Sequence, residues 1–193
     1  MSDEANVHHS SKTVEHYTPI EIIEAARETM GGIDLDPAST LSVNTHRVKA
    51  ETYYGKKDGA LSRHWSGRVF LNPPGGLDIA TRKSNAAVWW AKLAEEYDAG
   101  RVTQAIFVGF TLEILATSQD ACIWLGDFPL CFPRARIAFW TETAPGEFKR
   151  GGSPAHSNVI GYLHPAFEVD AQGERPGVMR FKRAFRGMGR VRL

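Results

Sequence analysis

The sequence predicts an α/β fold with a mostly parallel sheet, helices on both faces, and antiparallel strands at the end. Three observations lead to this prediction. Short apolar segments alternate with segments of helical periodicity through much of the chain. The apolar segments are continuous runs, which are typical of strands buried on both faces. The later part of the chain is richer in strand-like segments.

The composition is that of one globular domain. The chain has 193 residues, 42% of them hydrophobic and 10% aromatic, which favours a full core and excludes a disordered chain. The formal net charge of +1 excludes a polycation, so a nucleic-acid surface must be a local patch. No apolar run approaches the ~18 residues of a membrane span, and the polar start has no signal-peptide core. We therefore expect a cytoplasmic protein that does not enter a membrane.

The two cysteines and the histidines do not have the spacing of a metal site. Cys122 and Cys131 lie in apolar surroundings, which favours two reduced thiols. We expect no bound metal.

A helix is predicted over residues 20–30, because apolar residues recur there at helical spacing and Gly31-Gly32 follows them. Thr18 is expected to be its N-cap and Pro19 its first residue. Residues 1–15 are polar and are expected to form a flexible N-terminal arm.

Three short strands are predicted next, at 33–36, 52–54 and 68–71, with a helix or turn over 40–50. Pro37 ends the first strand, and prolines also follow the third.

The second half begins with a predicted helix over 80–98, a buried strand over 104–110 and a short helix over 112–119. Three further apolar segments are predicted to be strands: 121–125, 135–140 and 158–163. Residues 141–157 are rich in Gly, Pro and charge and are predicted to be a loop.

Two polar motifs follow predicted strands: Asp34-Leu35-Asp36-Pro37-Ala38-Ser39 and Asn72-Pro73-Pro74-Gly75-Gly76. Open α/β sheets bind ligands beyond the carboxyl ends of their strands, where the strand order reverses. The sequence therefore predicts a binding site at these strand ends.

Asn72-Pro73-Pro74 suits the alignment of a planar amino group. Two prolines give the chain a stiff, extended exit from the strand. The Asn72 side-chain oxygen and the Pro73 carbonyl can then both accept hydrogen bonds from one NH2 group, which keeps the nitrogen lone pair aimed at an electrophile. The alternative is a tight turn, since every residue here is turn-prone.

Together with these motifs, several shorter pieces occur in a characteristic order between Tyr17 and Leu163. They are Tyr17-Thr18-Pro19, Asn44, Tyr53-Tyr54, Asp58-Gly59-Ala60-Leu61, Trp65, Phe70-Leu71, Arg136-Ile137-Ala138-Phe139 and Ser157-Asn158-Val159-Ile160. In these pieces the chain resembles the Dam-like family of phage and prophage DNA N6-adenine methyltransferases. The resemblance implies a Rossmann-like methyltransferase domain over 16–179, S-adenosylmethionine (SAM) as cofactor and double-stranded DNA as partner.

The resemblance also implies roles for individual residues. Asn72, Pro73 and Pro74 would be catalytic. The cofactor would be bound by Tyr17, Thr18, Pro19, Asp34, Asp36, Pro37, Ala38, Ser39, Asn44 and Asp58. In this set a carboxylate suits the methionine ammonium, Ser39 and the following helix N-terminus suit its carboxylate, Asn44 would meet the ribose, and Asp58 would accept from the adenine amino group. The alternatives are a helix N-cap at Asp36 and a turn carboxylate at Asp58.

The chain departs from the family pattern in two places. It has no Gly-x-Gly loop after the first strand, and Gly75 stands where amino-methyltransferases place an aromatic residue. An aromatic platform contributes roughly 1–3 kcal/mol per stacked base. Either another ring replaces it, or the substrate differs, or activity is lost. The candidate replacements are Trp89, Trp90, Phe110 and Trp140.

Basic residues predict two regions that bind nucleic acid. Residues 180–193 are expected to form a basic C-terminal tail, with Arg180, Lys182, Arg183, Arg186, Arg190 and Arg192. Arg134, Arg136, Lys149 and Arg150 lie in or near the 141–157 loop, which is the candidate target-recognition segment. The alternative is a solvated charged surface.

These expectations combine into a SAM-dependent DNA methyltransferase acting on the N6 amino group of adenine. A second possibility keeps the cofactor and changes the acceptor to RNA, a free nucleotide, cytosine N4 or a protein amide. A third is a catalytically inactive nucleic-acid-binding protein on the same scaffold. The sequence leaves the oligomeric state and the recognition sequence open.

Overall fold

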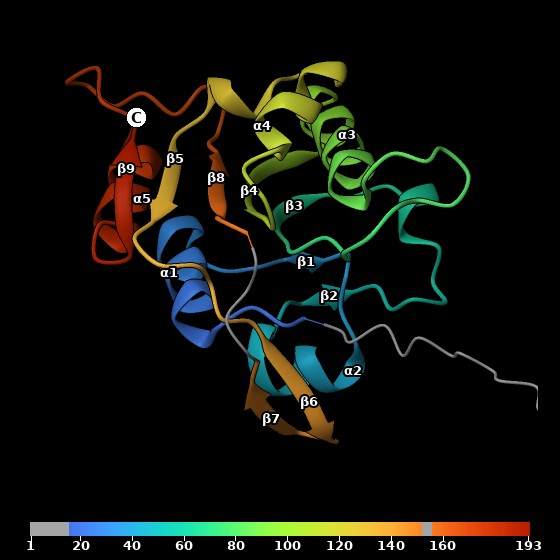
Figure 1. Cartoon of the computed structure of the whole chain (residues 1–193). Helices are drawn as coiled ribbons and strands as arrows, with labels where there is room; N and C mark the ends of the chain where they lie inside the picture. Colours follow the sequence, from blue (N-terminus) through green and yellow to red (C-terminus); the bar gives the residue numbers. More distant parts are fainter. Residues whose placement is uncertain (1–15, 152–155) are drawn as a thin grey trace, which may run out of the picture.

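The computed structural model describes residues 16–151 and 156–193, and its centre is one seven-stranded mixed sheet with the order β2-β1-β3-β4-β8-β5-β9 (Figure 1). The parallel strands are β1 (Leu35–Asp36), β2 (Thr52–Tyr53), β3 (Gly67–Leu71) and β4 (Val102–Gly109). The remaining strands are antiparallel to their neighbours: β8 (Val159–Leu163), β5 (Leu130–Pro133) and β9 (Gly189–Arg192). The predicted α/β architecture with antiparallel strands at the end is confirmed at this level.

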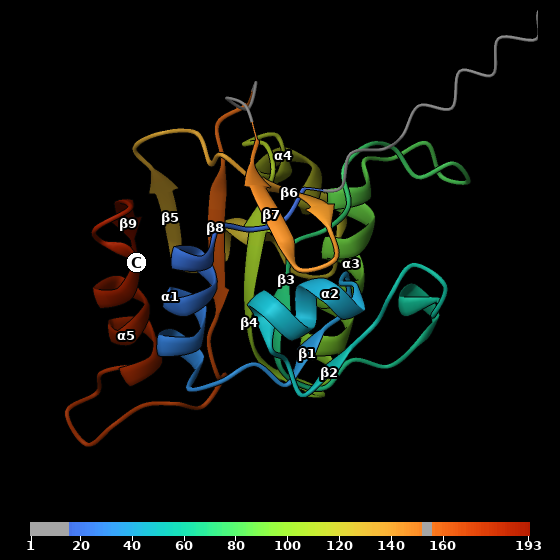
Figure 2. The ribbon, with the colours of Figure 1, turned by 90° about the horizontal axis from the view of Figure 1, so that it is seen from below.

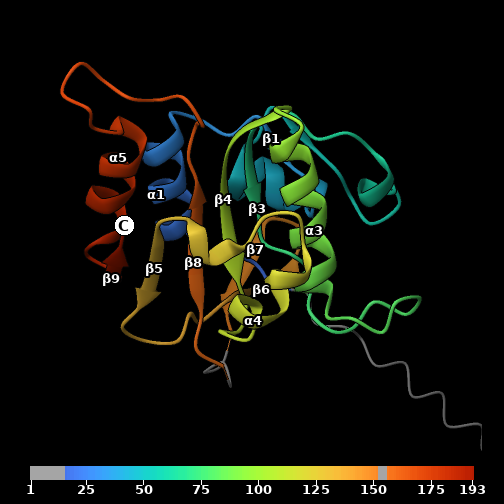
Figure 3. The same cartoon turned by 90° about the horizontal axis from the view of Figure 1, so that it is seen from above.

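Helices cover both faces of the sheet. One face carries α1 (Ile20–Met30) and α5 (Pro176–Phe185), which lie side by side, and the other carries α3 (Asn85–Asp98) and α4 (Ile114–Thr117) (Figure 3). The apolar run of β4 explains this arrangement. Ile106 and Val108 pack in the core with α1 and α5, whereas Ala105 and Phe107 pack in the core with α3. A strand buried on both faces needs apolar side chains in both directions.

The strand order reverses between β1 and β3, which are direct neighbours with Leu35 paired to Val69. From β1 the chain passes through α2 (Leu41–Val43) and the π-helical turn η1 (Asn44–Val48) to β2 on one side. From β3 it passes through α3 to β4 on the other side. Open α/β sheets bind ligands at the carboxyl ends of two strands that diverge in this way. Three short 3-10 turns complete the connections: η2 (Ala60–Ser62), η3 (Ser118–Asp120) and η4 (Leu125–Asp127).

A β-hairpin, β6 (Trp140–Ala144) and β7 (Glu147–Arg150), occupies most of the segment predicted to be a loop. Its turn is Pro145-Gly146, in which Gly146 has a φ of 81°. The hairpin lies against α2 (Figure 2). There the Gly146 amide donates to the Ser42 hydroxyl at 3.1 Å, and Ser42 donates to the Glu142 carboxylate. The loop prediction was therefore wrong for 141–150, while 152–155 lie outside the described residues.

Two predicted strands were also wrong. Residues 121–123 form a bend and Leu125 begins η4, and the Ile123 carbonyl accepts from the indole N–H of Trp90 at 2.9 Å in place of a sheet ladder. Only Trp140 of the segment 135–140 lies in a strand. Strand β5 was missed because it ends at Pro133 and follows Pro129, and prolines argue against a strand.

Two helix starts differ from the prediction. Pro19, and not Thr18, is the N-cap of α1. Helix α3 begins at Asn85 rather than at 80, and the Ser84 hydroxyl caps it by accepting from the Ala87 amide at 3.2 Å.

Residues 180–193, expected to be a tail, form most of α5 and the edge strand β9. The expected arm, 1–15, lies outside the described residues. In the described part of the chain no helix combines the length and the apolar character needed to cross a bilayer.

Candidate functional site

The carboxyl ends of β1 and β3 bring the two predicted motifs to one edge of the sheet. We call the residues 16–19, 36–39 and 72–76 the strand-end site. The two motifs are 32 or more residues apart along the chain, and the pairing of β1 with β3 makes them neighbours in space. Both motifs therefore lie at the same edge of the sheet, where the sequence predicts a binding site.

Asp36 is a buried carboxyl at the end of β1. It is 3% exposed, and burial raises its pKa from 3.8 to about 6. The Ala38 amide donates to Asp36 Oδ1 at 3.1 Å, which opposes the rise only in part. Pro37 and Ser39 are also buried, and the Ser39 hydroxyl lies beside the Asp36 carboxyl. A buried carboxyl with a raised pKa in a crevice is a candidate for binding a cation.

Asp34, two residues earlier, has a different environment. The guanidinium and the backbone amide of Arg68 both donate to its carboxylate, the amide at 2.7 Å. These hydrogen bonds lower the pKa of Asp34. The Asp34 charge is thus matched by Arg68 where β1 and β3 begin, which is a structural role, and its part in cofactor binding stays a prediction.

The segment before α1 crosses the site and joins it to the hairpin. Tyr17 exchanges two backbone hydrogen bonds with Trp140, at 2.7 and 2.8 Å. The Thr18 carbonyl accepts from Arg47 Nη2 at 3.0 Å. Pro19 is buried at the helix start. The Thr18 side chain is buried too, and its Oγ1 has no hydrogen-bond partner among the described residues.

Arg47 holds this side of the site together. Its guanidinium lies 5.1 Å from the ring centre of Trp140 and 4.9 Å from that of Phe148. Cation–π contacts of this kind attach the hairpin to η1. Sequence reasoning missed Arg47, because nothing in the sequence predicts that its partners come together.

The Asn72 side chain has a defined orientation. Its Nδ2 donates to the His16 carbonyl at 2.9 Å. Because a carbonyl only accepts, the amide nitrogen must face His16, and Oδ1 is left as a hydrogen-bond acceptor. Pro73 is buried and Pro74 is exposed. The contact from His16 had no sequence signal, because it comes from a backbone atom.

Two other predicted cofactor residues have turn roles. Both ends of the Asn44 amide bond to the backbone of Ala50, at 2.8 and 3.1 Å, which gives this side chain a local role. Its contact with a ribose stays a prediction. Asp58 is exposed, and its Oδ2 accepts from the Gly55 amide at 2.7 Å. A Cβ at Gly55 would lie 3.8 Å from the Ser39 carbonyl oxygen, so this turn does lie beside the strand-end site.

The predicted basic residues fall into two groups. In the α5–β9 region, which we define as residues 176–192, Arg180 pairs with Glu168 at 3.2 Å, Arg183 pairs with Glu28 at 2.9 Å, and Arg192 donates to the Phe128 carbonyl at 3.1 Å. Other basic residues are exposed and show no side-chain partner among the described residues: Arg134, Lys149, Arg150, Lys182, Arg186 and Arg190. Arg136 is exposed as well.

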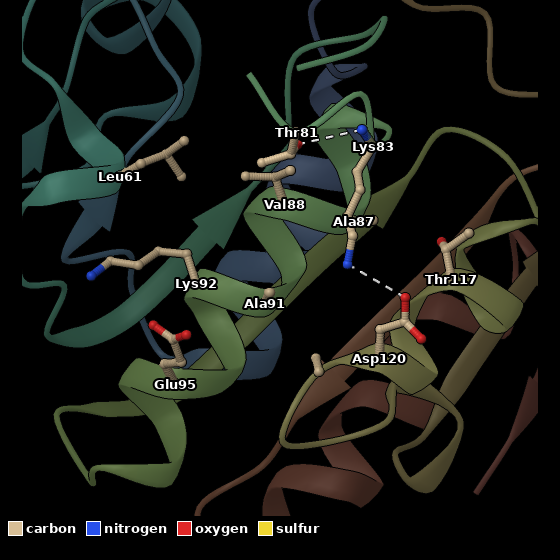
Figure 4. Close-up of a pocket in the computed structure, with 11 residues that line it drawn as sticks. Leu61, Thr81, Lys83, Ala87, Val88, Ala91, Lys92, Glu95, Thr117 and Asp120 are labelled. Carbon is tan, nitrogen blue, oxygen red and sulfur yellow. Dashed lines mark hydrogen bonds and ion pairs between the residues drawn. The ribbon is translucent and has the colours of Figure 1, made fainter. Parts of the chain in front are cut away.

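A cavity of about 330 Å³ lies along α3 (Figure 4). It is lined by small and charged side chains, with Lys83 and Asp120 facing each other at 3.5 Å. None of the predicted catalytic or cofactor residues lines it. Within 16–151 and 156–193, no three His, Cys, Asp or Glu side chains gather as a metal site requires.

Comparison with protein-family models and with curated proteins finds no match to this chain.

Proposed function

We propose that the protein is a SAM-dependent DNA methyltransferase that acts on the N6 amino group of adenine, on a Rossmann-like methyltransferase fold. One observation carries the proposal. The neighbouring ends of β1 and β3 combine a buried carboxyl, Asp36, with an amide oxygen acceptor, Asn72 Oδ1, that is followed by two prolines. This combination provides for a cation on one side and for a planar NH2 group on the other.

The residues beside β1 fit the charged end of SAM. Asp36 has no basic partner in the hydrogen bonds and ion pairs of the described residues, so a ligand ammonium or sulfonium would supply the charge that it lacks. Thr18 Oγ1, also in the strand-end site, is buried without a hydrogen-bond partner among the described residues, and burying such a group costs free energy. A polar ligand would satisfy this hydroxyl, and a positive charge on the ligand would satisfy Asp36.

The residues after β3 would align the acceptor. SAM, when bound, supplies an electrophilic methyl group on a sulfonium. Asn72 Oδ1 and the Pro73 carbonyl would accept the two hydrogens of the amine, which leaves its lone pair free for attack. Holding the amine in this orientation is the main contribution expected of the protein. The amine sheds its proton after attack, so no basic side chain is required at this position.

Double-stranded DNA as the acceptor requires the adenine to leave the base stack, because N6 is paired inside the duplex. The exposed Lys149 and Arg150 of the hairpin support contact with the phosphates. The hairpin is tied to the strand-end site by Tyr17 and Arg47, so it is the segment that we propose for target recognition.

The non-catalytic alternative has one observation in its favour, which is Gly75. Without a ring at this position the acceptor loses a stacking partner. A nucleic-acid-binding protein on this scaffold would not require a working amine site.

The acceptor test uses SAM labelled on its methyl group. Double-stranded DNA without methylated bases, RNA and an unrelated protein are each incubated with the enzyme, and the label transferred to each is counted. We expect transfer to DNA by the wild type and by Gln119→Ala, an exposed carboxamide control on η3. We expect no transfer by Asn72→Ala. Label found only in RNA or in protein would show that the acceptor is not DNA. No label in any of the three would favour the non-catalytic nucleic-acid-binding protein.

A further inference from the structure

A small cavity lies directly beside the two prolines of the strand-end site. Its volume is about 110 Å³, and its walls include Pro73, Pro74, Gly75, Phe110 and Thr111. Phe110 follows the end of β4, and β4 pairs with β3. No other aromatic side chain of the described residues lines this cavity.

The other rings that might replace the one missing at Gly75 are engaged elsewhere. Trp90 is fully buried and packs edge-on against Phe107. Trp89 packs against Trp65, with 5.7 Å between ring centres. Trp140 lies under the guanidinium of Arg47. Phe110 alone of the four candidates is half-buried at the cavity.

Phe110 is also held in place. Its ring is stacked on Phe139, with 5.1 Å between centres and an interplanar angle of 26°, and the His16 ring lies 5.7 Å away. Its carbonyl accepts from Asn158 Nδ2 at 2.9 Å. His16 also holds the Asn72 amide through its carbonyl. The same residue therefore contacts the predicted amine-aligning side chain and the aromatic ring.

Gly75, which also lines the cavity, leaves space for a Cβ. A Cβ built on Gly75 would meet no atom of the described residues within 4 Å, and the positive φ lies at Gly76 and not at Gly75. The loop itself is anchored, because Asn85 Nδ2 donates to the Gly75 carbonyl at 2.8 Å. A side chain can therefore begin at 75 without a clash at its Cβ.

We propose that this cavity is the acceptor site and that Phe110 supplies the aromatic surface against which the amine-bearing base packs. The inference rests on the proposed function, because it assumes that a base is the acceptor. It identifies the ring that compensates for Gly75 and places it directly after β4, on a different strand end from the Asn72-Pro73-Pro74 segment.

The test measures N6-methyladenine by nucleoside mass spectrometry, with SAM and bacterial genomic DNA that lacks adenine methylation. Phe110→Leu keeps the apolar packing on Phe139 and removes the flat ring. We expect it to lower kcat/KM for DNA roughly 5- to 150-fold, the equivalent of one lost stacking contact. Phe110→Tyr keeps the flat ring and should retain more activity than Phe110→Leu. The control Phe167→Leu, which removes a ring that is 96% exposed, should match the wild type. Calorimetric SAM binding should be unchanged in all of them.

The double variant Phe110→Leu with Gly75→Tyr separates stacking from packing. We expect the new ring at 75 to restore much of the lost activity, which it would not do if Phe110 only supported the fold. Full activity in Phe110→Leu, or no recovery in the double variant, overturns the inference while the proposed function stands. If the wild type is inactive and Gly75→Tyr alone is active, the scaffold is a methyltransferase and Phe110 does not compensate. If neither forms N6-methyladenine, the proposed function fails and this inference with it.

Discussion

The strand-end site and the α5–β9 region differ in whether their polar side chains have partners. In the α5–β9 region the arginines that face the protein are matched, as in the pairs Arg180–Glu168 and Arg183–Glu28. In the strand-end site, as far as the described residues go, Thr18 Oγ1 has no hydrogen-bond partner and Asp36 is buried without a basic neighbour. Matched groups stabilise a fold, whereas unmatched buried groups destabilise it and are kept where a ligand is bound. The comparison therefore favours the strand ends as the place of the proposed function and assigns a stabilising role to the arginine pairs of α5.

The largest expected effect is at Asp36. Its folded-state pKa of about 6 exceeds the ordinary 3.8, so the folded protein keeps a proton that the unfolded chain releases between these values. The free energy of unfolding should then fall as pH rises from about 4 to 6 and stay lower above that, by roughly 3 kcal/mol. Asp36→Asn should remove this fall, stabilise the protein at pH 7 and weaken SAM binding.

Urea unfolding of wild type and Asp36→Asn at pH 4.5 and 7.5 measures the stability difference, and calorimetry measures SAM affinity. If the stability difference between Asp36→Asn and the wild type is the same at both pH values, and SAM affinity is unchanged, Asp36 is not part of the binding site.

Arg180→Ala should have the next largest effect. It should lower stability and leave SAM binding unchanged, the reverse of Asp36→Asn at pH 7. Arg180 Nε donates to the Thr29 carbonyl at 2.9 Å, near the end of α1, and the guanidinium pairs with Glu168. Losing a charged hydrogen bond of this kind costs about 1–3 kcal/mol. Thermal unfolding should show the loss, while SAM affinity and methyl transfer at 20 °C should match those of the wild type. Reduced SAM affinity in a folded variant would contradict the separation between the two regions.

Two buried threonines form a matched pair for the third prediction. Thr29 Oγ1 donates to the Ala25 carbonyl at 2.7 Å, whereas Thr18 Oγ1 has no partner. Thr29→Val should destabilise the protein by about 1 kcal/mol, because it removes a made hydrogen bond. Thr18→Val should be neutral or stabilising and should weaken SAM binding. Urea unfolding measures both changes. An equal fall in the free energy of unfolding of the two variants would mean that both hydroxyls stabilise the fold.

The smallest expected effect concerns DNA contact. Lys149 and Arg150 lie on the hairpin tied to the strand-end site, and Lys182 and Arg186 are exposed on or directly after α5. Each phosphate contact contributes about 0.9 to the slope of log K against log salt. Lys149→Ala with Arg150→Ala should lower the slope by about 1.8, measured by fluorescence anisotropy with duplex DNA. Lys182→Ala with Arg186→Ala should leave it nearly unchanged; the reverse result would assign DNA contact to α5.

The sequence predicted the central sheet and the two strand-end motifs because both depend on local signals. The apolar runs at 68–71 and 104–110 and the prolines after Asp36 and Asn72 are readable in order along the chain. The hairpin was missed although Pro145-Gly146 separates two polar–apolar segments, because Gly, Pro and charge also describe a loop. Strand β9 depends on pairing with β5, 56 or more residues away, and a basic segment alone does not predict that pairing.

The sequence indicates which residue types gather at the candidate site, but it does not predict which contacts each of them makes. Asp34 and Asp36 are two positions apart in a strand, so the pattern does not distinguish them. Their difference arises from Arg68, which reaches Asp34 only because β1 pairs with β3. The contacts of Arg47 and of the His16 carbonyl likewise exist only in the folded chain.

The most direct test of the account is nucleoside mass spectrometry on unmethylated double-stranded DNA incubated with SAM and either wild type or Asn72→Ala. The account predicts N6-methyladenine from the wild type and none from the variant, with SAM affinity in the two proteins equal within a few-fold. N6-methyladenine at the same rate from Asn72→Ala would contradict the assigned role of Asn72. A folded wild type that does not bind SAM and yields no methylated base would contradict the proposed methyltransferase function.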